Sequence, residues 1–191
     1  MDWNSNFLVL CWIVIIWVIL YSRIGLTRWG ISERNVEREH RISAGAIVMQ
    51  EDQILLVRYN NTNGKSYLVG PGGTVLSNEG IYRAVVREVW EENGLEVSPQ
   101  KVLFVEDLLS RRYRIVKIWL LCNLVGGQLT NTQKALEEGI TDVAWYRKDQ
   151  LLNEIVYPPA LLSYDWEAFF QNNWESKYSE LRETNFWVPD R

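Results

Sequence analysis

Hydrophobic and polar positions follow three different patterns along the chain. Residues 7–21 form an uninterrupted apolar run, FLVLCWIVIIWVILY, with no charge and no helix breaker. After residue 43, short apolar runs rich in β-branched side chains alternate with polar loops, which is typical of strands. Two later segments, residues 81–93 and 159–181, repeat their apolar positions at helical spacing. The chain therefore divides into an apolar N-terminal segment and a mixed α and β region.

The strand pattern predicts an α+β fold with a mixed sheet. Residues 44–49 and 54–59, separated by the polar sequence QEDQ, predict a β-hairpin. Further strands are expected at residues 67–69, 102–105, 115–124 and 143–146. Strands and helices do not alternate regularly, which disfavours a doubly wound parallel sheet. The aromatic residues of segment 159–181 predict a C-terminal helix that packs on the core.

The N-terminal run predicts a transmembrane helix. Fifteen residues would cover only about 22 Å of a hydrocarbon core about 30 Å thick, but an extension to residues 7–26 reaches the required length. Arginines follow the run and none precedes it, so the positive-inside rule places the N-terminus outside and the rest of the chain in the cytoplasm. A buried or oligomer-forming helix and a signal peptide are the alternatives. A signal peptide would need a basic start and a small-residue cleavage site, and neither is visible.

These patterns predict three parts: a hydrophobic segment over residues 1–30, a charged linker over 31–41, and a folded domain over 42–191 that ends in the C-terminal helix. The net charge of −4 disfavours a nucleic-acid polymer as partner, because such domains are usually basic. Cys11 and Cys122 cannot form a disulfide framework. His40 is the single histidine and is expected to be a linker residue. A homodimer stays open.

The segment from Gly70 to Val97 carries the candidate chemistry. A glycine-rich turn, residues 70–73, precedes a helix that Ser77 or Asn78 can cap and that Gly94 can end in a left-handed conformation. Glycines let the backbone approach a ligand closely.

Three carboxylates gather near the end of this helix. Glu88, Glu91 and Glu92 lie within about 100° of one face, with Glu88 and Glu92 at the edge of the side that packs inward. A solvated acidic helix end is the alternative, but it would oppose the helix dipole and place like charges together. A cation would offset both effects, and oxygen ligands select Mg²⁺ or Mn²⁺. Beside a glycine-rich loop, this arrangement predicts metal-assisted phosphate chemistry.

The same segment resembles the signature of the Nudix hydrolases. That signature is a glycine, five residues, a glutamate, seven residues, and then Arg-Glu-apolar-any-Glu-Glu-any-Gly-apolar. Gly73, Glu79 and the run from Arg87 to Leu95 occupy every fixed position. The resemblance covers about residues 40–150. It implies an α/β/α sandwich around a mixed sheet and the hydrolysis of a nucleoside diphosphate linked to another moiety.

The resemblance also implies roles for individual residues. The implied metal-binding groups are Glu88, Glu91 and Glu92, with a backbone carbonyl of Gly72 or Gly73. Arg87 is expected to orient a glutamate, and its spacing also predicts an ion pair with Glu91. Glu79 is expected to have a supporting structural role. The bound Mg²⁺ would activate the attacking water.

The catalytic base is less sharply defined by the motif. In some members it is a glutamate between later strands, here Glu137 or Glu138, of which we assign Glu138; in others it lies in the motif, where Glu88 is the candidate. Arg58 could contact a substrate phosphate, or it could be an exposed strand-end arginine. Two other functions stay open: a regulatory module that binds nucleotides without turnover, and a membrane-tethered interaction protein.

Overall fold

The computed structural model describes residues 38–60, 65–110 and 112–184. The predicted N-terminal helix and residues 31–37 of the predicted linker lie outside the described residues, so membrane attachment stays a prediction. Within the described part of the chain, no helix has the length and apolarity needed to cross a membrane. The linker was predicted to extend to residue 41, but residues 39–41 belong to the first strand because their backbone pairs with residues 113–115.

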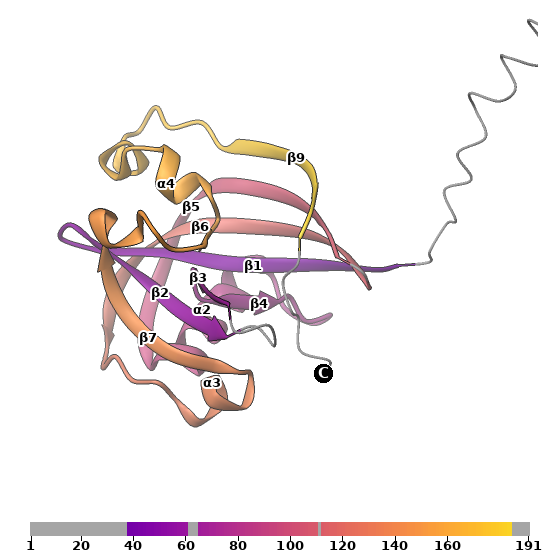
Figure 1. Cartoon of the computed structure of the whole chain (residues 1–191), viewed down its shortest axis with the longest axis horizontal. Helices are drawn as coiled ribbons and strands as arrows, with labels where there is room; N and C mark the ends of the chain where they lie inside the picture. The colour runs from indigo at the N-terminus through magenta and orange to yellow at the C-terminus, as the bar shows by residue number, and fades with distance from the viewer. Residues whose placement is uncertain (1–37, 61–64, 111, 185–191) are drawn as a thin grey trace, which may run out of the picture. The chain divides into compact units, whose positions relative to one another are not determined.

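The described strands form a mixed sheet in the order β8-β3-β2-β1-β6-β5-β9, with β4 beside β1 and β7 beside β2 (Figure 1). The strands are β1 (Glu39–Gln50), β2 (Gln53–Asn60), β3 (Ser66–Val69), β4 (Gly72–Thr74), β5 (Leu95–Leu109), β6 (Tyr113–Gly127), β7 (Ile140–Arg147), β8 (Val156–Tyr157) and β9 (Lys177–Glu183). The predicted hairpin is confirmed as β1 and β2, and the mixed sheet is confirmed by the parallel pairing of β1 with β6 beside the antiparallel pairing of β5 with β6.

Strand β1 divides the sheet into two halves. Its pairing with β2 is confined to the residues next to the turn, Met49 with Ile54 and Gln50 with Gln53. Further along the same strand, residues 43–45 pair instead with β4. One half therefore contains β4, β1, β6, β5 and β9, and the other contains β7, β2, β3 and β8. This split brings the glycine-rich turn before β4 alongside the middle of β1.

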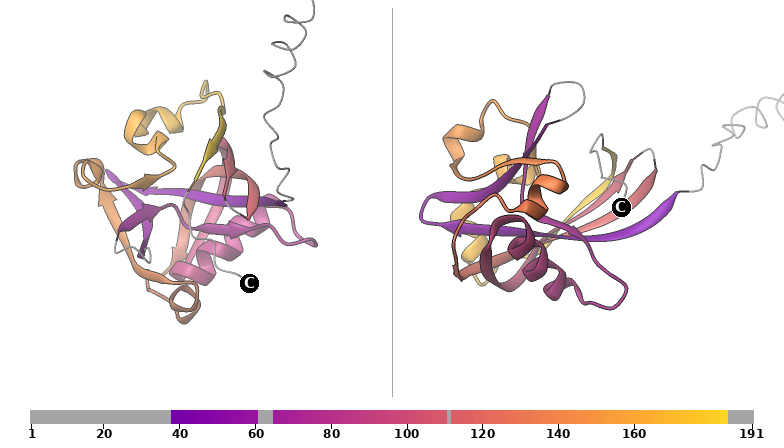
Figure 2. Two further views of the ribbon diagram at one scale, coloured as in Figure 1. Left: turned by 45° about the vertical axis from the view of Figure 1, so that its right-hand side comes forward. Right: turned by 90° about the horizontal axis from the view of Figure 1, so that it is seen from below.

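Helix α2 (Ile81–Asn93) has the predicted bounds and covers one face of the first half (Figure 2). Its buried Ala84, Val85 and Val89 pack against alternate residues of β1 and β6, which point to the same side because strand side chains alternate. Gly94 ends the helix with φ 68°, as predicted. The predicted N-cap is wrong, since Gly80 occupies that position without a side-chain cap.

The predicted C-terminal helix over residues 159–181 is wrong, because short elements form in its place. This segment forms α4 (Ala160–Ser163), the 3-10 helix η2 (Trp166–Phe170) and strand β9. Phe169 packs edge-to-face on Phe104 and Trp174, so its helical spacing reflects one aromatic cluster. Strand β9 then pairs in parallel with the edge of β5. The remaining helices are α3 (Gln133–Glu137) and the 3-10 helix η1 (Lys148–Leu151).

Candidate active site

The glycine-rich turn and β4 bring backbone directly against helix α2. Gly72 has φ 146°, and a Cβ at that position would lie 2.2 Å from the carbonyl oxygen of Ala44. A Cβ on Gly73 would lie 2.4 Å from Glu88 Oε1. Gly72 therefore requires glycine, because its φ and the β1 backbone leave no space for a Cβ, whereas a Cβ on Gly73 would displace the Glu88 carboxylate.

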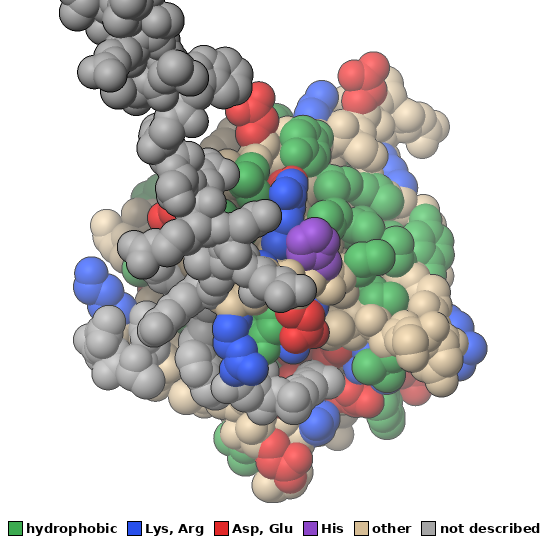
Figure 3. Space-filling model, turned by 90° about the vertical axis from the view of Figure 1, so that its right-hand side faces the viewer, with side chains coloured by type: hydrophobic (Ala, Val, Ile, Leu, Met, Phe, Trp, Pro, Cys, Tyr) green, Lys and Arg blue, Asp and Glu red, His purple; other side chains and the backbone are tan. Residues whose placement is uncertain are grey.

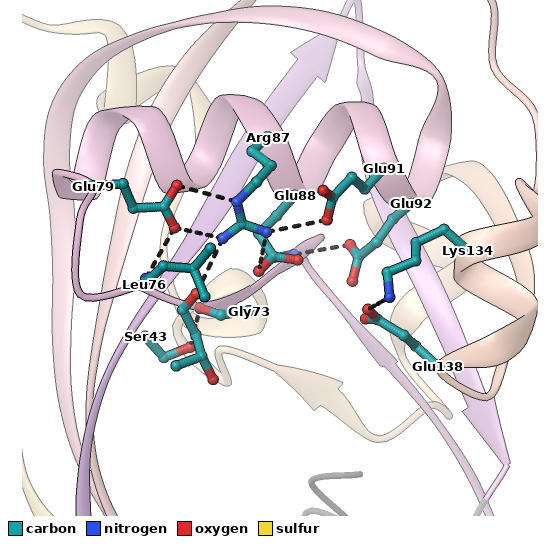
Figure 4. A network of polar contacts seen from close by, with 12 residues as sticks. Ser43, Gly73, Leu76, Glu79, Arg87, Glu88, Glu91, Glu92, Lys134 and Glu138 are labelled. Carbon is teal, nitrogen blue, oxygen red and sulfur yellow. Dashed lines mark hydrogen bonds and ion pairs between the residues drawn. The ribbon is translucent and has the colours of Figure 1, made fainter. Parts of the chain in front are cut away.

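Polar contacts then fix the two glycines relative to their neighbours. The amide of Gly72 donates a hydrogen bond to Glu92 Oε2 at 2.9 Å. The carbonyl of Gly73 accepts one from the Ser43 hydroxyl at 2.7 Å (Figure 4). The predicted metal-binding role of a glycine carbonyl is untested, and the observed Gly72 contact is made by its amide.

Three glutamates form a compact carboxylate group. Glu88 and Glu92 come from successive turns of α2 and are 0% and 1% exposed, and Glu138 follows α3 and is 9% exposed. One carboxylate oxygen of each lies within 4.8 Å of those of the other two. The structure thus brings together Glu88, Glu92 and Glu138, which were predicted separately. It does not place Glu91 in this group, because Glu91 lies at the more exposed edge of the helix.

Arg87 is the centre of a second set of contacts on the same helix (Figure 4). It donates two hydrogen bonds to Glu79, at 2.6 and 3.1 Å, and one to the carbonyl of Thr74 at 3.1 Å. Its Nη1 lies 2.9 Å from Glu88 Oε1 and 3.1 Å from Glu91 Oε2. The predicted pair with Glu91 is therefore present. Arg87 also holds the side chain of Glu88 while its own guanidinium is fixed to the loop before α2.

Glu79 completes this support. Its Oε1 accepts a hydrogen bond from the amide of Leu76 at 3.0 Å. The hydrogen bonds from Arg87 lower the pKa of Glu79, so its carboxylate is charged over a wide pH range. Glu79 thus ties the loop between β4 and α2 to the helix, in agreement with the supporting role expected of it.

The negative charges of the carboxylate group are not fully neutralised by the described residues. Glu92 Oε1 is buried and has no hydrogen-bond partner among the described residues. Burial, followed by the charge of Glu88, raises the pKa of Glu92 well above its ordinary value, although the Gly72 amide opposes the shift. A divalent cation would satisfy the open oxygen and offset the repulsion. The donors are all carboxylate oxygens, which fit Mg²⁺ or Mn²⁺.

Helix α3 delivers Glu138 to this group. Thr132 caps α3 by accepting a hydrogen bond from the Ala135 amide at 3.0 Å, and its hydroxyl also donates to the carbonyl of Glu91. This double contact attaches α3 to the end of α2. Glu138 forms an ion pair with Lys134 at 3.3 Å, whereas Glu137 is exposed. Of the two predicted candidates for the base, the structure therefore brings Glu138 to the site.

Arg58 does not join the carboxylate group. Its guanidinium forms an ion pair with Glu154 at 2.9 Å and donates a hydrogen bond to Ser66 Oγ at 2.9 Å. The next residue of β2, Tyr59, is the one whose pKa is raised by burial and by the charges of Glu92, Glu138 and Glu88. The described contacts therefore assign Arg58 to joining β2, β3 and the loop before β8.

Some residues near the site were missed by sequence reasoning. Lys117 was counted only as part of the strand sequence IVKIWLLCNL, although a single lysine in an apolar strand is a usable signal. Thr132 stands three residues before Ala135 at the start of a short helix, as a capping residue does. Tyr59 carried no signal, since alternation alone does not say which face of β2 meets the carboxylates. His40 was predicted to be a linker residue. It lies in strand β1 and is exposed on the surface shown in Figure 3.

The mixed sheet, the glycine-rich turn and the buried carboxylates on one helix together define the fold and candidate active site of a Nudix-type enzyme. Residues 39–166 match the model of the NUDIX domain, and the chain belongs to this family. It is a Nudix hydrolase that acts on phosphorus-containing anhydrides.

Named relatives and solved structures agree with this assignment. An ADP-ribose pyrophosphatase of Methanocaldococcus jannaschii is 30% identical over 125 residues, 64% of this chain and 74% of that protein. The human 8-oxo-dGDP phosphatase NUDT18 is 33% identical over 104 residues, which are 53% of this chain but only 30% of that protein. The crystal structure of an ADP-ribose pyrophosphatase from Streptococcus suis superposes with a TM-score of 0.55 and 26% identity, covering 73% of this chain and 98% of that one.

Proposed function

We propose that the protein is a Mg²⁺-dependent hydrolase that cleaves the pyrophosphate linkage of a nucleoside diphosphate derivative with water. The observation that carries the proposal is the buried group of Glu88, Glu92 and Glu138, in which one oxygen of Glu92 has no hydrogen-bond partner among the described residues. A buried carboxylate group with an open oxygen is costly unless a cation occupies it. The related ADP-ribose pyrophosphatase and 8-oxo-dGDP phosphatase support a nucleotide derivative as substrate.

The helix residues have distinct roles in this proposal. Glu88 and Glu92 would hold the Mg²⁺, with Glu91, which pairs with Arg87 at the exposed edge of α2, as a further proposed ligand. A bound Mg²⁺ would neutralise phosphate oxygens and lower the pKa of the attacking water. Arg87 keeps the Glu88 carboxylate oriented through its 2.9 Å contact, while Gly72 orients Glu92. The lack of side chains at Gly72 and Gly73 lets β4 lie directly against β1 and the Glu88 carboxylate.

Glu138 is the proposed general base. It reaches the carboxylate group from α3, a different element from the metal-binding helix, so it can accept the proton of the water without being part of the helical ligand set. Its ion pair with Lys134 at 3.3 Å holds the carboxylate in place at the end of α3. The neighbouring Glu137 is exposed and offers a matched control.

The test is turnover by the full-length protein. A panel that includes ADP-ribose, 8-oxo-dGDP and other nucleoside diphosphate derivatives is incubated with and without Mg²⁺, and nucleoside monophosphate release is measured. We expect turnover only with the metal. Glu138→Gln should lower kcat by about 100-fold or more, as expected for the loss of a general base, while Glu137→Gln stays within about twofold of the wild type. Absence of turnover for every compound with Mg²⁺ and with Mn²⁺ would refute the proposal.

A further inference from the structure

Lys117 lies on β6, and the proposed function assigns it no role. In the sheet register it stands between Ser43 of β1 and Glu106 of β5. Ser43 is the residue that donates a hydrogen bond to the Gly73 carbonyl. Lys117 is therefore on the strand next to the residue that anchors β4, close to the glycine-rich turn.

Two glycines leave room for the Lys117 side chain and the ring beside it. The ammonium Nζ lies 4.4 Å from the centroid of the Trp119 ring. A Cβ on Gly45 would lie 2.3 Å from Cζ3 of Trp119 and 3.1 Å from Cε of Lys117. A Cβ on Gly70 would lie 2.8 Å from Trp119 Cζ3. The lysine stem and the indole are thus held under the backbone of β1 and of the glycine-rich turn, which restricts where the ammonium can lie.

The ammonium of Lys117 is partly buried and forms no ion pair with the described residues. Burial lowers the pKa of Lys117, and the carboxylates of Glu92, Glu106 and Glu88 oppose this shift. The other cations around these carboxylates already have partners: Arg87 pairs with Glu79, Glu88 and Glu91, Lys134 with Glu138, and Arg182 with Glu106. Lys117 therefore has a positive charge that the described structure does not commit to a carboxylate.

The charges of the proposed reaction need such a cation. The three carboxylates of the site carry up to three negative charges, and one Mg²⁺ offsets two of them. A pyrophosphate group brings at least two more. Charge-assisted hydrogen bonds from a partly desolvated ammonium to phosphate oxygens are among the stronger polar contacts. An ammonium on the strand next to Ser43, within reach of the charges of Glu92 and Glu88, can supply them.

We propose that Lys117 is a substrate-binding residue whose ammonium contacts non-bridging oxygens of the pyrophosphate group held beside the carboxylates. The inference rests on the proposed function, because it assigns a ligand of that same site. The ligand class is a diphosphate anion accompanied by a divalent cation. The contact is made by the lysine directly and does not depend on which group is attached to the diphosphate.

The experiment compares Lys117→Met, Lys117→Arg and Lys101→Met in the full-length protein. Lys101 is a partly buried lysine whose Nζ donates to the Gln171 carbonyl at 2.7 Å, so it controls for the loss of a lysine. Calorimetry measures the affinity of inorganic pyrophosphate for each Mg²⁺-saturated protein, and the affinity of Mg²⁺ alone. We expect Lys117→Met to weaken pyrophosphate binding about 10- to 100-fold, the size of one hydrogen bond to a charged group, and not to weaken Mg²⁺ binding. Lys117→Arg should retain most of the affinity.

Two results would overturn the proposal. One is pyrophosphate binding by Lys117→Met within about twofold of the wild type and of Lys101→Met. The other is a parallel loss of Mg²⁺ binding, which would show that Lys117 supports the carboxylates and does not bind the anion. A wild type that binds pyrophosphate but turns over no compound of the panel would refute the proposed function alone, because the binding comparison would still decide the role of Lys117.

Discussion

Glu92 and Glu106 are buried to nearly the same extent, 1% and 2% exposed, but their surroundings differ. Glu106 has a partner at both oxygens: the Trp119 indole N–H at 2.7 Å and the Arg182 guanidinium at 2.5 Å. Glu92 accepts one hydrogen bond, from Gly72, and its other oxygen has none among the described residues. Burial alone therefore does not indicate a functional carboxylate. A buried carboxylate with an oxygen that lacks a hydrogen-bond partner is the better indicator.

The two carboxylates also depend on different parts of the chain. Glu92 lies within the family signature, and its contacts come from α2 and the glycine-rich turn. Glu106 is paired by Arg182 of β9, which lies beyond residue 166, where the family match ends. Arg182 also lies over the Tyr157 ring, 5.7 Å from its centroid. The C-terminal strand thus joins the edge of β5 to β8, and Glu106 belongs to the stability of the fold.

The largest effect should come from removing the charge of Glu92. Glu92→Gln takes away a proposed metal-binding carboxylate, so kcat/KM should fall by about 100-fold or more, because the activation of water and the neutralisation of phosphate both depend on the bound ion. The substitution also removes a buried negative charge that repels Glu88. Without metal, the variant should therefore unfold at a higher temperature than the wild type at pH 8. Steady-state kinetics checks the fall in kcat/KM, and thermal unfolding without metal checks the rise in unfolding temperature.

The opposite pattern is expected for Glu106→Gln. Breaking this buried pair should cost about 2 to 4 kcal/mol of the free energy of unfolding, because the amide cannot satisfy Arg182 as the carboxylate does. Turnover by the folded protein should change far less than in Glu92→Gln. Urea unfolding of Glu106→Gln, Arg182→Met and the double variant gives their coupling energy. A coupling energy near zero would contradict the structural role of the pair.

A smaller effect concerns pH. The pKa of Glu92 is raised well above its ordinary value of 4.5, so the folded protein without metal binds this proton more tightly than the unfolded chain does. The contribution of Glu92 to stability is then fully present below pH 4.5 and is lost as pH rises through the raised pKa. Mg²⁺ must displace that proton, so the increase in Tm on adding Mg²⁺ should grow as pH rises from about 5 to 8.

The matching control is Glu92→Gln in the same buffers. Its Tm without metal should lack the fall with pH that is attributed to Glu92, and Mg²⁺ should raise its Tm little at any pH. Parallel curves for the wild type and the variant across this range would show that Glu92 is not the group that titrates.

How far the sequence predicts this molecule depends on whether an interaction is local. Helix α2 could be predicted to the residue, because its apolar period and its left-handed glycine at residue 94 lie within the segment itself. The width of its buried face could not be predicted in the same way, because the apolar side chains Tyr82 and Val86 are 50% and 38% exposed. How much of a helix face is covered depends on the breadth of the sheet beneath it, which local periodicity does not encode.

The candidate site shows the same limit. Glu88 and Glu92 could be placed from spacing, and Glu138 from the family resemblance. The contact among the three requires Thr132 to join α3 to α2, which is a tertiary interaction. The C-terminal strand could not be predicted, because residues 177–183 become a strand only where the edge of β5 offers backbone partners. The aromatic spacing of that segment predicts a helix. In the structure, Trp166, Phe169 and Trp174 have this spacing because they belong to one hydrophobic cluster.

The smallest effect is expected at Arg58. It was a candidate for a phosphate contact, but it is joined to Glu154 and Ser66 in a half-buried position. Arg58→Met should cost about 1 kcal/mol of the free energy of unfolding, as partly exposed bidentate pairs do, and should leave kcat/KM within about twofold of the wild type. Glu154→Gln should cost a similar amount, and the double variant little more than either single one. Because a substrate contact would raise KM in Arg58→Met and not in Glu154→Gln, the pair of variants separates a structural arginine from a phosphate-binding one.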